Sequence, residues 1–100
     1  MVIEINPAKV KNLNKYSMGK KYREVYKIDE LDTNPDNIYI HIAPKIFSMN
    51  YEFFDAMFGE SVKKLGSSAF YSKYQFMTGN KMREQISQFI SRCAIEYKEM

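Results

Sequence analysis

The chain has 100 residues, which suits one compact domain and is short for two, because domains usually have about 100 to 150 residues. Hydrophobic residues make up 45% of the sequence and charged residues 27%, which excludes a disordered or fibrous chain. The net charge of +3 is too small to indicate a dedicated nucleic-acid binder. Aromatic residues reach 15%, which predicts rings in the core and further rings on a partner surface.

No stretch approaches the roughly 20 apolar residues that a membrane-spanning helix needs, and the first residues lack the apolar block of a secretory signal. We therefore expect a cytoplasmic protein without a membrane partner. The single cysteine, Cys93, has no partner in the chain for a disulfide, and the single histidine, His41, provides no spacing pattern for zinc. We expect no metal and no cofactor.

The N-terminal third combines a short strand with a basic segment. Residues 2–5 alternate apolar and polar side chains, which predicts a strand that a turn ends at residues 6–7. From Lys9 to Lys27 there is one acid, Glu24, among seven basic residues: Lys9, Lys11, Lys15, Lys20, Lys21, Arg23 and Lys27. A turn is predicted at residues 17–19, and apolar side chains at helical spacing predict a helix over about residues 20–31.

Residues 38–42 form the clearest predicted strand. Three isoleucines alternate with Tyr39 and His41, so the isoleucines would fill one face of a sheet. The other face would carry Tyr39 and His41, and helices on both sides of the sheet would cover it too. We interpret His41 as a packed or rim histidine rather than a catalyst. Residues 46–49 are predicted to be a connecting loop.

Two further helices and one strand are expected in the second half. Asn50 is a good N-cap, and the apolar spacing after it predicts a helix over about residues 51–65 that ends at Gly66. A loop at residues 67–68 and an aromatic strand centred on residues 72–76 follow. The last helix should run from about 81 to 98, with this apolar stripe: Met82, Ile86, Phe89, Ile90, Cys93 and Tyr97. Cys93 on that stripe indicates a buried, inert thiol.

The order strand, helix, strand, helix, strand, helix predicts the α/β class. We expect the whole chain, residues 1–100, to form one small β-α-β-α-β-α sandwich with a largely parallel sheet and helices packed on it. The sequence has no recognisable Ser, His and Asp set and no glycine-rich phosphate loop. An enzymatic role is therefore not expected.

Several segments resemble the STAS-like domains of bacteria and phages. They are Gly-Lys-Lys-Tyr-Arg at residues 19–23, the strand at residues 38–42, and Glu-Phe-Phe-Asp-Ala-Met-Phe-Gly at residues 52–59. The last segment is similar to the family pattern Ser-Phe-x-Asp-x-x-Phe-Gly, and the similarity spans roughly residues 15–97. The resemblance implies a fold related to anti-sigma-factor antagonists, which bind a kinase-like ATPase and are switched by phosphorylation of a serine at the start of this helix.

This chain departs from the family pattern at that serine, because it has Glu52 there. Glu52 either mimics the phosphorylated state or simply favours the first turn of a helix. Ser48, in the loop just ahead, is the substitute phosphoacceptor that the sequence offers.

Our preferred hypothesis is a non-enzymatic regulatory module that binds another protein, with a histidine-kinase-like ATPase as the implied partner. The binding surface would be the loop and first helical turn around residues 44–55, with Ser48, Asn50, Tyr51, Glu52 and Asp55 as its contacts. Tyr51 is the predicted anchor, because tyrosine is enriched at interface hot spots. Phe53, Phe54 and Phe58 are expected in the core.

Two alternatives stay open. The basic region would contact nucleic acid through Lys15, Lys20, Lys21, Arg23 and Lys27, interleaved with tyrosines, or it would be a solvated face. A phage-encoded inhibitor of a host defence complex would use the same small fold as a decoy. An exposed edge of the first strand would also allow a homodimer.

Overall fold

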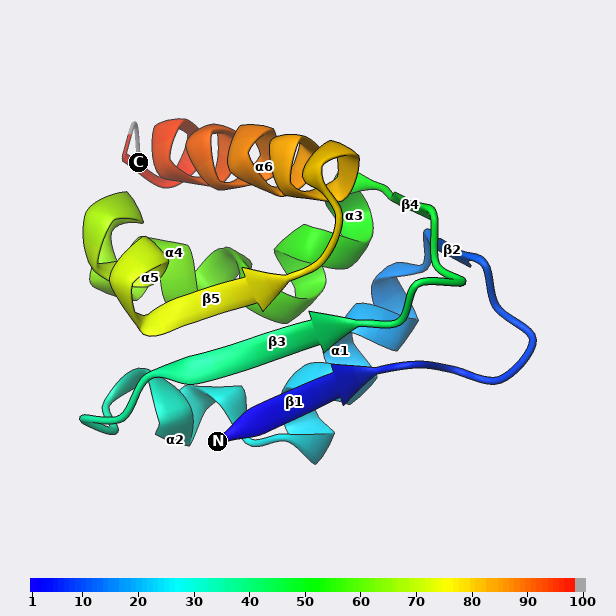
Figure 1. Cartoon of the computed structure of the whole chain (residues 1–100). Helices are drawn as coiled ribbons and strands as arrows, with labels where there is room; N and C mark the ends of the chain where they lie inside the picture. Colours follow the sequence, from blue (N-terminus) through cyan, green and yellow to red (C-terminus); the bar gives the residue numbers. More distant parts are fainter. Residues whose placement is uncertain (99–100) are drawn as a thin grey trace.

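Three parallel strands form the central sheet in the computed structural model, which describes the backbone of residues 1–98 and the side chains of residues 1–96. The strands β1 (Val2–Ile5), β3 (Ile38–Ile42) and β5 (Tyr74–Met77) lie in the order β1-β3-β5, with β3 in the middle (Figure 1). The short strands β2 (Asn12–Leu13) and β4 (Ser48–Met49) form a separate parallel pair. The predicted parallel sheet is confirmed.

The helices alternate with these strands, as predicted for an α/β sandwich. In Figure 1, α1 and α2 lie behind β1 and β3, and α6 runs along the top of the molecule. The helical segments in chain order are α1 (Tyr16–Val25), α2 (Ile28–Asp32), α3 (Tyr51–Phe54), the π-helical η1 (Asp55–Gly59), α4 (Glu60–Leu65), α5 (Ser67–Lys73) and α6 (Asn80–Lys98).

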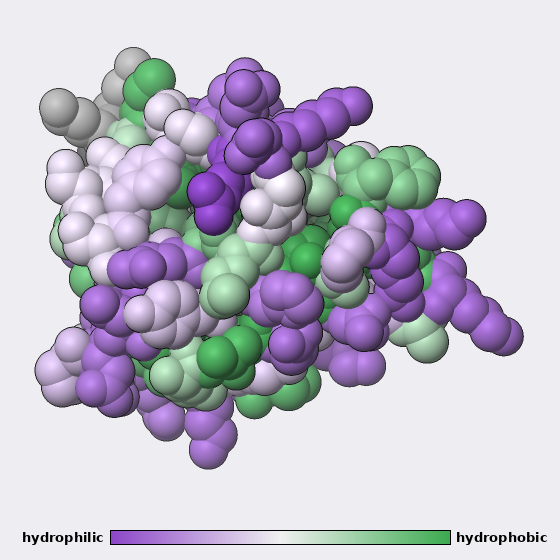
Figure 2. Space-filling model, in the orientation of Figure 1, coloured by the Kyte–Doolittle hydropathy of each residue, from purple (hydrophilic) through white to green (hydrophobic). Residues whose placement is uncertain are grey.

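The sheet has one buried face and one open face. Ile3, Ile40 and Phe76 share a row on the helix-covered side, and Ile3 and Ile40 have no exposed surface. The side chains of the two neighbouring rows lie on the opposite face of the sheet. One row consists of Val2, Tyr39 and Gln75, and the other of Glu4, His41 and Met77. The isoleucines therefore fill one face as predicted, and none of the helices within residues 1–98 covers the other. Figure 2 shows this side of the molecule, where apolar surface lies between polar side chains.

The N-terminal helix differs from its prediction. The expected turn at residues 17–19 is wrong, because these residues lie inside α1, and the expected helix over residues 20–31 is two helices. They separate at Lys27, whose φ of 54° is left-handed. Gly19 is needed inside α1 for close packing, since a Cβ atom there would lie 2.5 Å from the main-chain oxygen of Phe53. The turn was predicted because glycine is common in turns, whereas Gly19 serves the packing of a helix.

The predicted helix over residues 51–65 is a continuous helical run, but its middle widens into η1. It ends at Gly66, whose φ of 83° favours glycine, as expected. The predicted loop at residues 67–68 is wrong, because α5 begins there, and the expected loop at residues 46–49 contains β4. The aromatic strand centred on residues 72–76 is present but starts later than predicted, because α5 extends to Lys73 and β5 covers Tyr74–Met77. Helix α6 begins at Asn80, one residue before the predicted start, and the side chain of Tyr97 lies outside the described ones.

One hydrophobic cluster joins the helices to the covered face of the sheet. Phe53, Phe54 and Phe58 are fully buried, which confirms the prediction that they belong to the core. Phe58 makes edge-on ring contacts with Phe70 and Phe76 at centroid distances of 5.7 and 5.4 Å. Aromatic rings from the π-helical segment, α5 and β5 therefore lock together in this core.

No helix within residues 1–98 is both long enough and apolar enough to cross a membrane.

Candidate functional site

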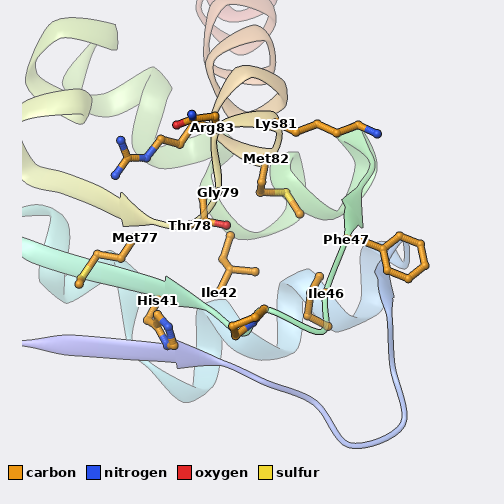
Figure 3. Close-up of a pocket in the computed structure, with 12 residues that line it drawn as sticks. His41, Ile42, Ile46, Phe47, Met77, Thr78, Gly79, Lys81, Met82 and Arg83 are labelled. Carbon is orange, nitrogen blue, oxygen red and sulfur yellow. The ribbon is translucent and has the colours of Figure 1, made fainter.

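A hollow of about 660 Å³ lies where β3 and β5 end (Figure 3). Its walls come from the end of β3, the loop at residues 44–47, the β5–α6 turn and the first turn of α6. Ligands of α/β sheets commonly bind outside the carboxyl ends of the parallel strands. This end of the sheet is therefore the first place to look for a binding site.

The hollow has an apolar floor and two exposed apolar side chains at its margins. Ile42, Ile46 and Met82 are buried and form the floor. Phe47 is 63% exposed and Met77 is 48% exposed. In Figure 3, Phe47 stands at one end of the hollow and Met77 at the other. Large apolar groups held in water beside a concave surface are typical of an interaction site.

The polar rim is cationic. Lys81 and Arg83 are exposed on the first turn of α6 and extend to opposite sides of Met82 (Figure 3). His41 lies on the rim, half-buried, and its Nδ1 is 2.7 Å from Oε2 of Glu4. None of the residues that line the hollow is acidic. The lining therefore carries positive charge, and the carboxylate of Glu4 lies beside it at His41.

The loop that carries Phe47 is held at both ends. The Nζ of Lys45 donates a 2.7 Å hydrogen bond to the main-chain oxygen of Pro7, and the amide of Phe47 donates to the oxygen of Lys11 at 3.0 Å. These bonds fix the backbone on either side of residue 46. The exposed ring of Phe47 is thus presented from an ordered loop, which lowers the entropy cost of binding.

The predicted contacts Ser48 and Asn50 hold the start of the following helix. Ser48 is half-buried in β4 and donates to Oδ1 of Asn12. Asn50 is the N-cap of α3, since its Oδ1 accepts from the amide of Phe53 at 3.0 Å and its Nδ2 donates to the oxygen of Asn14 at 3.1 Å. The cap was predicted, and the polar groups of both residues already have partners within the chain.

Tyr51 is not on the surface, so its prediction as an exposed anchor is wrong. It is 9% exposed beneath α6, and its hydroxyl donates to Oε2 of Glu96 at 2.7 Å. The guanidinium of Arg92 lies 3.8 Å from the centre of its ring, a cation–π contact. Burial, followed by hydrogen bonds with Cys93 and Glu96, raises the pKa of the Tyr51 phenol. Its amphipathic side chain joins α3 to α6 instead of meeting a partner.

Glu52 and Asp55 complete the predicted contact set. Glu52 is exposed in the first turn of α3, as a surface contact requires. Asp55 is half-buried, and its Oδ1 lies 3.9 Å from Sγ of Cys93. Cys93 has no exposed surface, which confirms the prediction of a buried thiol. The exposed part of the predicted surface is thus Glu52 and the loop before Ser48.

The residues predicted as alternative nucleic-acid contacts are also partly exposed and partly buried. Lys15, Lys21 and Lys27 are exposed, and Lys20 is half-buried with its Nζ 5.8 Å from the centre of the Tyr16 ring. Arg23 is only 5% exposed, so its prediction as a nucleic-acid contact is wrong. Its guanidinium instead donates to the main-chain oxygen of Met57 at 2.6 Å and to Oγ of Ser61 at 3.0 Å.

Arg23 belongs to a buried polar cluster at the centre of the helical layer. Asp32 is 4% exposed and accepts from Ser61 at 2.9 Å, from Lys64 at 3.2 Å and from Tyr74 at 2.6 Å. Desolvation and the hydrogen bond to Asp32 raise the pKa of the Tyr74 phenol. Arg23, Asp32 and Ser61 are all buried, and their hydrogen bonds hold α1, α2, α4 and β5 together.

No protein-family model, no curated protein and no solved structure matches this chain. The resemblance to STAS-like domains therefore stays a prediction. Within residues 1–98, no group of three or more His, Cys, Asp or Glu side chains is arranged to hold a metal ion.

Sequence reasoning missed Phe47, Met77, Lys81 and Arg83. One signal was present, because residues 43–45 and 78–80 each have the composition of a turn that follows a strand. In a parallel sheet both turns lie at the same edge, and side chains beside them converge. The sequence did not reveal that Phe47, rather than Tyr51, is the aromatic group left in water.

Proposed function

We propose that this chain is a non-enzymatic protein-interaction module that binds an apolar and acidic segment of a partner protein at the strand-end hollow. The observation that carries this proposal is that two exposed apolar side chains, Phe47 and Met77, flank a concave apolar floor. A partner's aliphatic or aromatic side chain would fill the hollow between them. Such aromatic anchors commonly dominate the binding energy of an interface.

The charge of the rim supports an acidic partner segment. Lys81 and Arg83 extend into solvent on the two sides of the floor, so carboxylates that flank the inserted side chain would meet a cation on either side. Charge complementarity of this kind raises the association rate and rejects basic competitors. Glu52 would mark the limit of the contact on α3, where it would select a basic residue of the partner.

The chemistry of the hollow favours binding over catalysis. His41 is the one lining residue of the type most used in acid–base catalysis, and it is paired with Glu4 outside the floor. The floor itself presents aliphatic and thioether groups, which hold a ligand without activating it. A histidine-kinase-like ATPase, implied by the resemblance to STAS-like domains, is the first partner to test.

A displayed peptide library selected on the immobilised chain tests this function for any partner sequence. We expect the enriched peptides to combine a large apolar residue with Asp or Glu. In calorimetric titration of the best peptide, Phe47→Ala should weaken binding at least about tenfold, or about 1.4 kcal/mol. Lys81→Glu should weaken it through charge reversal.

Ile95→Ala is the matched control, since Ile95 is an equally exposed apolar residue (59%) on the far part of α6. It should leave the affinity unchanged. Peptides that bind the Phe47→Ala variant as tightly as the parent would exclude the hollow as the site. If the histidine-kinase-like ATPase is the partner, Glu52→Lys should also weaken its binding. An unchanged affinity for the ATPase would mean that the partner-binding surface does not extend from the hollow to Glu52.

A further inference from the structure

A second groove, on the opposite wall of α1 from the buried Arg23 cluster, has a different chemistry. It has a volume of about 310 Å³ and lies between α1 and the segment that follows β1. This is near the lower limit for a small-molecule pocket and is large enough for one planar ring system. Its lining residues are Pro7, Met18, Lys21, Tyr22, Val25 and Tyr26.

Two tyrosine rings form a fixed aromatic wall of this groove. The planes of Tyr22 and Tyr26 differ by 9°, with their centroids 6.1 Å apart. The hydroxyl of Tyr26 donates to the main-chain oxygen of Glu4 at 3.0 Å, and the ring of Tyr22 packs edge-on against Phe53 at 6.2 Å. Both rings are therefore held in place before any ligand arrives.

The charge around this wall is positive. Lys21 lines the groove, and no lining residue is acidic. Glu24, the one acid between Lys9 and Lys27, lines a different hollow on the other side of α1. Lys15, at the N-cap of α1, and Lys9 and Lys11, in the segment after Pro7, are exposed. The groove therefore joins an aromatic wall to one lining lysine, with further exposed lysines on the two segments that form it and no carboxylate in its lining.

We propose that this groove binds single-stranded nucleic acid. An unpaired base stacks on the tyrosine wall, Val25 and Met18 cover its edge, and Lys21 with the neighbouring lysines contacts the phosphates. Proteins that bind single strands combine these two elements, a basic track and aromatic rings. Paired bases are stacked inside a duplex and are not available to the rings, so double-stranded nucleic acid should bind more weakly. DNA and RNA share the chemistry of the base face and the phosphate.

Fluorescence anisotropy tests the proposal with labelled oligo(dT) and oligo(U) of about 12 nucleotides, within the site size of single-strand binding folds. With about three phosphate contacts, the affinity should fall roughly 20-fold between about 50 mM and 200 mM salt. Equal affinity for the two probes would show that the groove recognises only the base and the phosphate. A clear preference for oligo(U) or for oligo(dT) would identify RNA or DNA, respectively, as the natural ligand.

Two variants test the groove itself. Tyr22→Leu removes a stacking ring and should weaken binding about tenfold. Because Tyr22 also packs on Phe53, Val25→Glu provides a second variant: Val25 is 62% exposed, so a carboxylate there repels phosphate without disturbing the core. Lys21→Glu should act in the same direction. The matched controls, Tyr71→Leu and Lys81→Glu, change an exposed tyrosine and an exposed lysine elsewhere and should bind about as the parent does.

The proposal is overturned if neither probe binds at low salt, or if a duplex of equal length binds as tightly. It is also overturned if Val25→Glu and Tyr22→Leu both bind as the parent does. The result is independent of the peptide-binding function, since Phe47→Ala should leave oligonucleotide binding intact and Val25→Glu should leave peptide binding intact.

Discussion

The guanidinium of Arg23 donates a 2.6 Å hydrogen bond to the main-chain oxygen of Met57, 34 residues further along the chain. Met57 lies in η1, where the helical run widens into a π turn. Such a turn is rare inside an α-helical run and is wider than a regular helical turn. Arg23 donates to a main-chain oxygen of this turn and so joins α1 to the segment that leads from α3 to α4.

Replacing Arg23 should therefore strongly destabilise the fold. Arg23→Met removes the side-chain donor to the oxygen of Met57 and the guanidinium charge that faces the buried carboxylate of Asp32. Removing one member of a buried ionic cluster costs about 3 to 5 kcal/mol of unfolding free energy. Urea denaturation followed by circular dichroism measures this loss.

Lys21→Met is the control, because Lys21 is exposed on the same helix. Its unfolding free energy should stay within about 0.5 kcal/mol of the parent. An Arg23→Met protein as stable as this control would mean that the cluster contributes nothing to the fold.

Gly19→Ala should also destabilise the protein, against the usual helix preference for alanine. A Cβ atom there would lie 2.5 Å from the oxygen of Phe53 and 2.9 Å from Cβ of Ala56, so α1 must move away. Overpacking of this kind costs about 1 to 3 kcal/mol. At Gly79 a Cβ would meet nothing within 4 Å, so Gly79→Ala should be nearly neutral. Equal melting temperatures for the two variants would contradict the close approach of α1.

The thiol of Cys93 should be unreactive in the folded protein. It has no exposed surface, and burial raises its pKa from 9.0 to about 11. At about pH 8 little thiolate forms and reagents cannot reach it. Reaction with a disulfide reagent should be slow in buffer and fast in concentrated urea. Rapid labelling of Cys93 in native buffer would contradict this prediction and show that α6 readily separates from the core.

The ion pair between Arg23 and Asp29 should make stability depend on pH in the acid range. A 2.5 Å hydrogen bond from Arg23, followed by the charge of that guanidinium, lowers the pKa of Asp29 below 3.8. The unfolded chain then takes up this proton more readily than the folded chain. The contribution is complete at neutral pH and is lost as the pH falls through the folded pKa.

Asp29→Asn measures this contribution. Because Asp29 is largely exposed, the parent should exceed the variant by at most about 1 kcal/mol at pH 7. The difference should shrink below about pH 4 and in about 1 M salt. A difference that stays constant from neutral to acid pH would indicate that the carboxylate charge is not its source.

Local patterns in the sequence predicted much of the architecture. The alternating isoleucines of β3, the cap at Asn50, the stop at Gly66 and the stripe that buries Cys93 each depend on residues a few positions apart. Such short-range spacing is fixed by the geometry of a strand or a helix, whatever surrounds it. The α/β class and the parallel sheet followed from the order of these elements.

Only the tertiary structure decided which side chains remain in water. Tyr51 and Phe47 are both aromatic residues beside the same loop, yet Tyr51 lies under α6 and Phe47 is exposed at the hollow. Arg23 resembles the lysines around it in the sequence, but it is buried against η1 and Asp32. Exposure depends on contacts between residues tens of positions apart, and these contacts exist only after the helices have packed on the sheet.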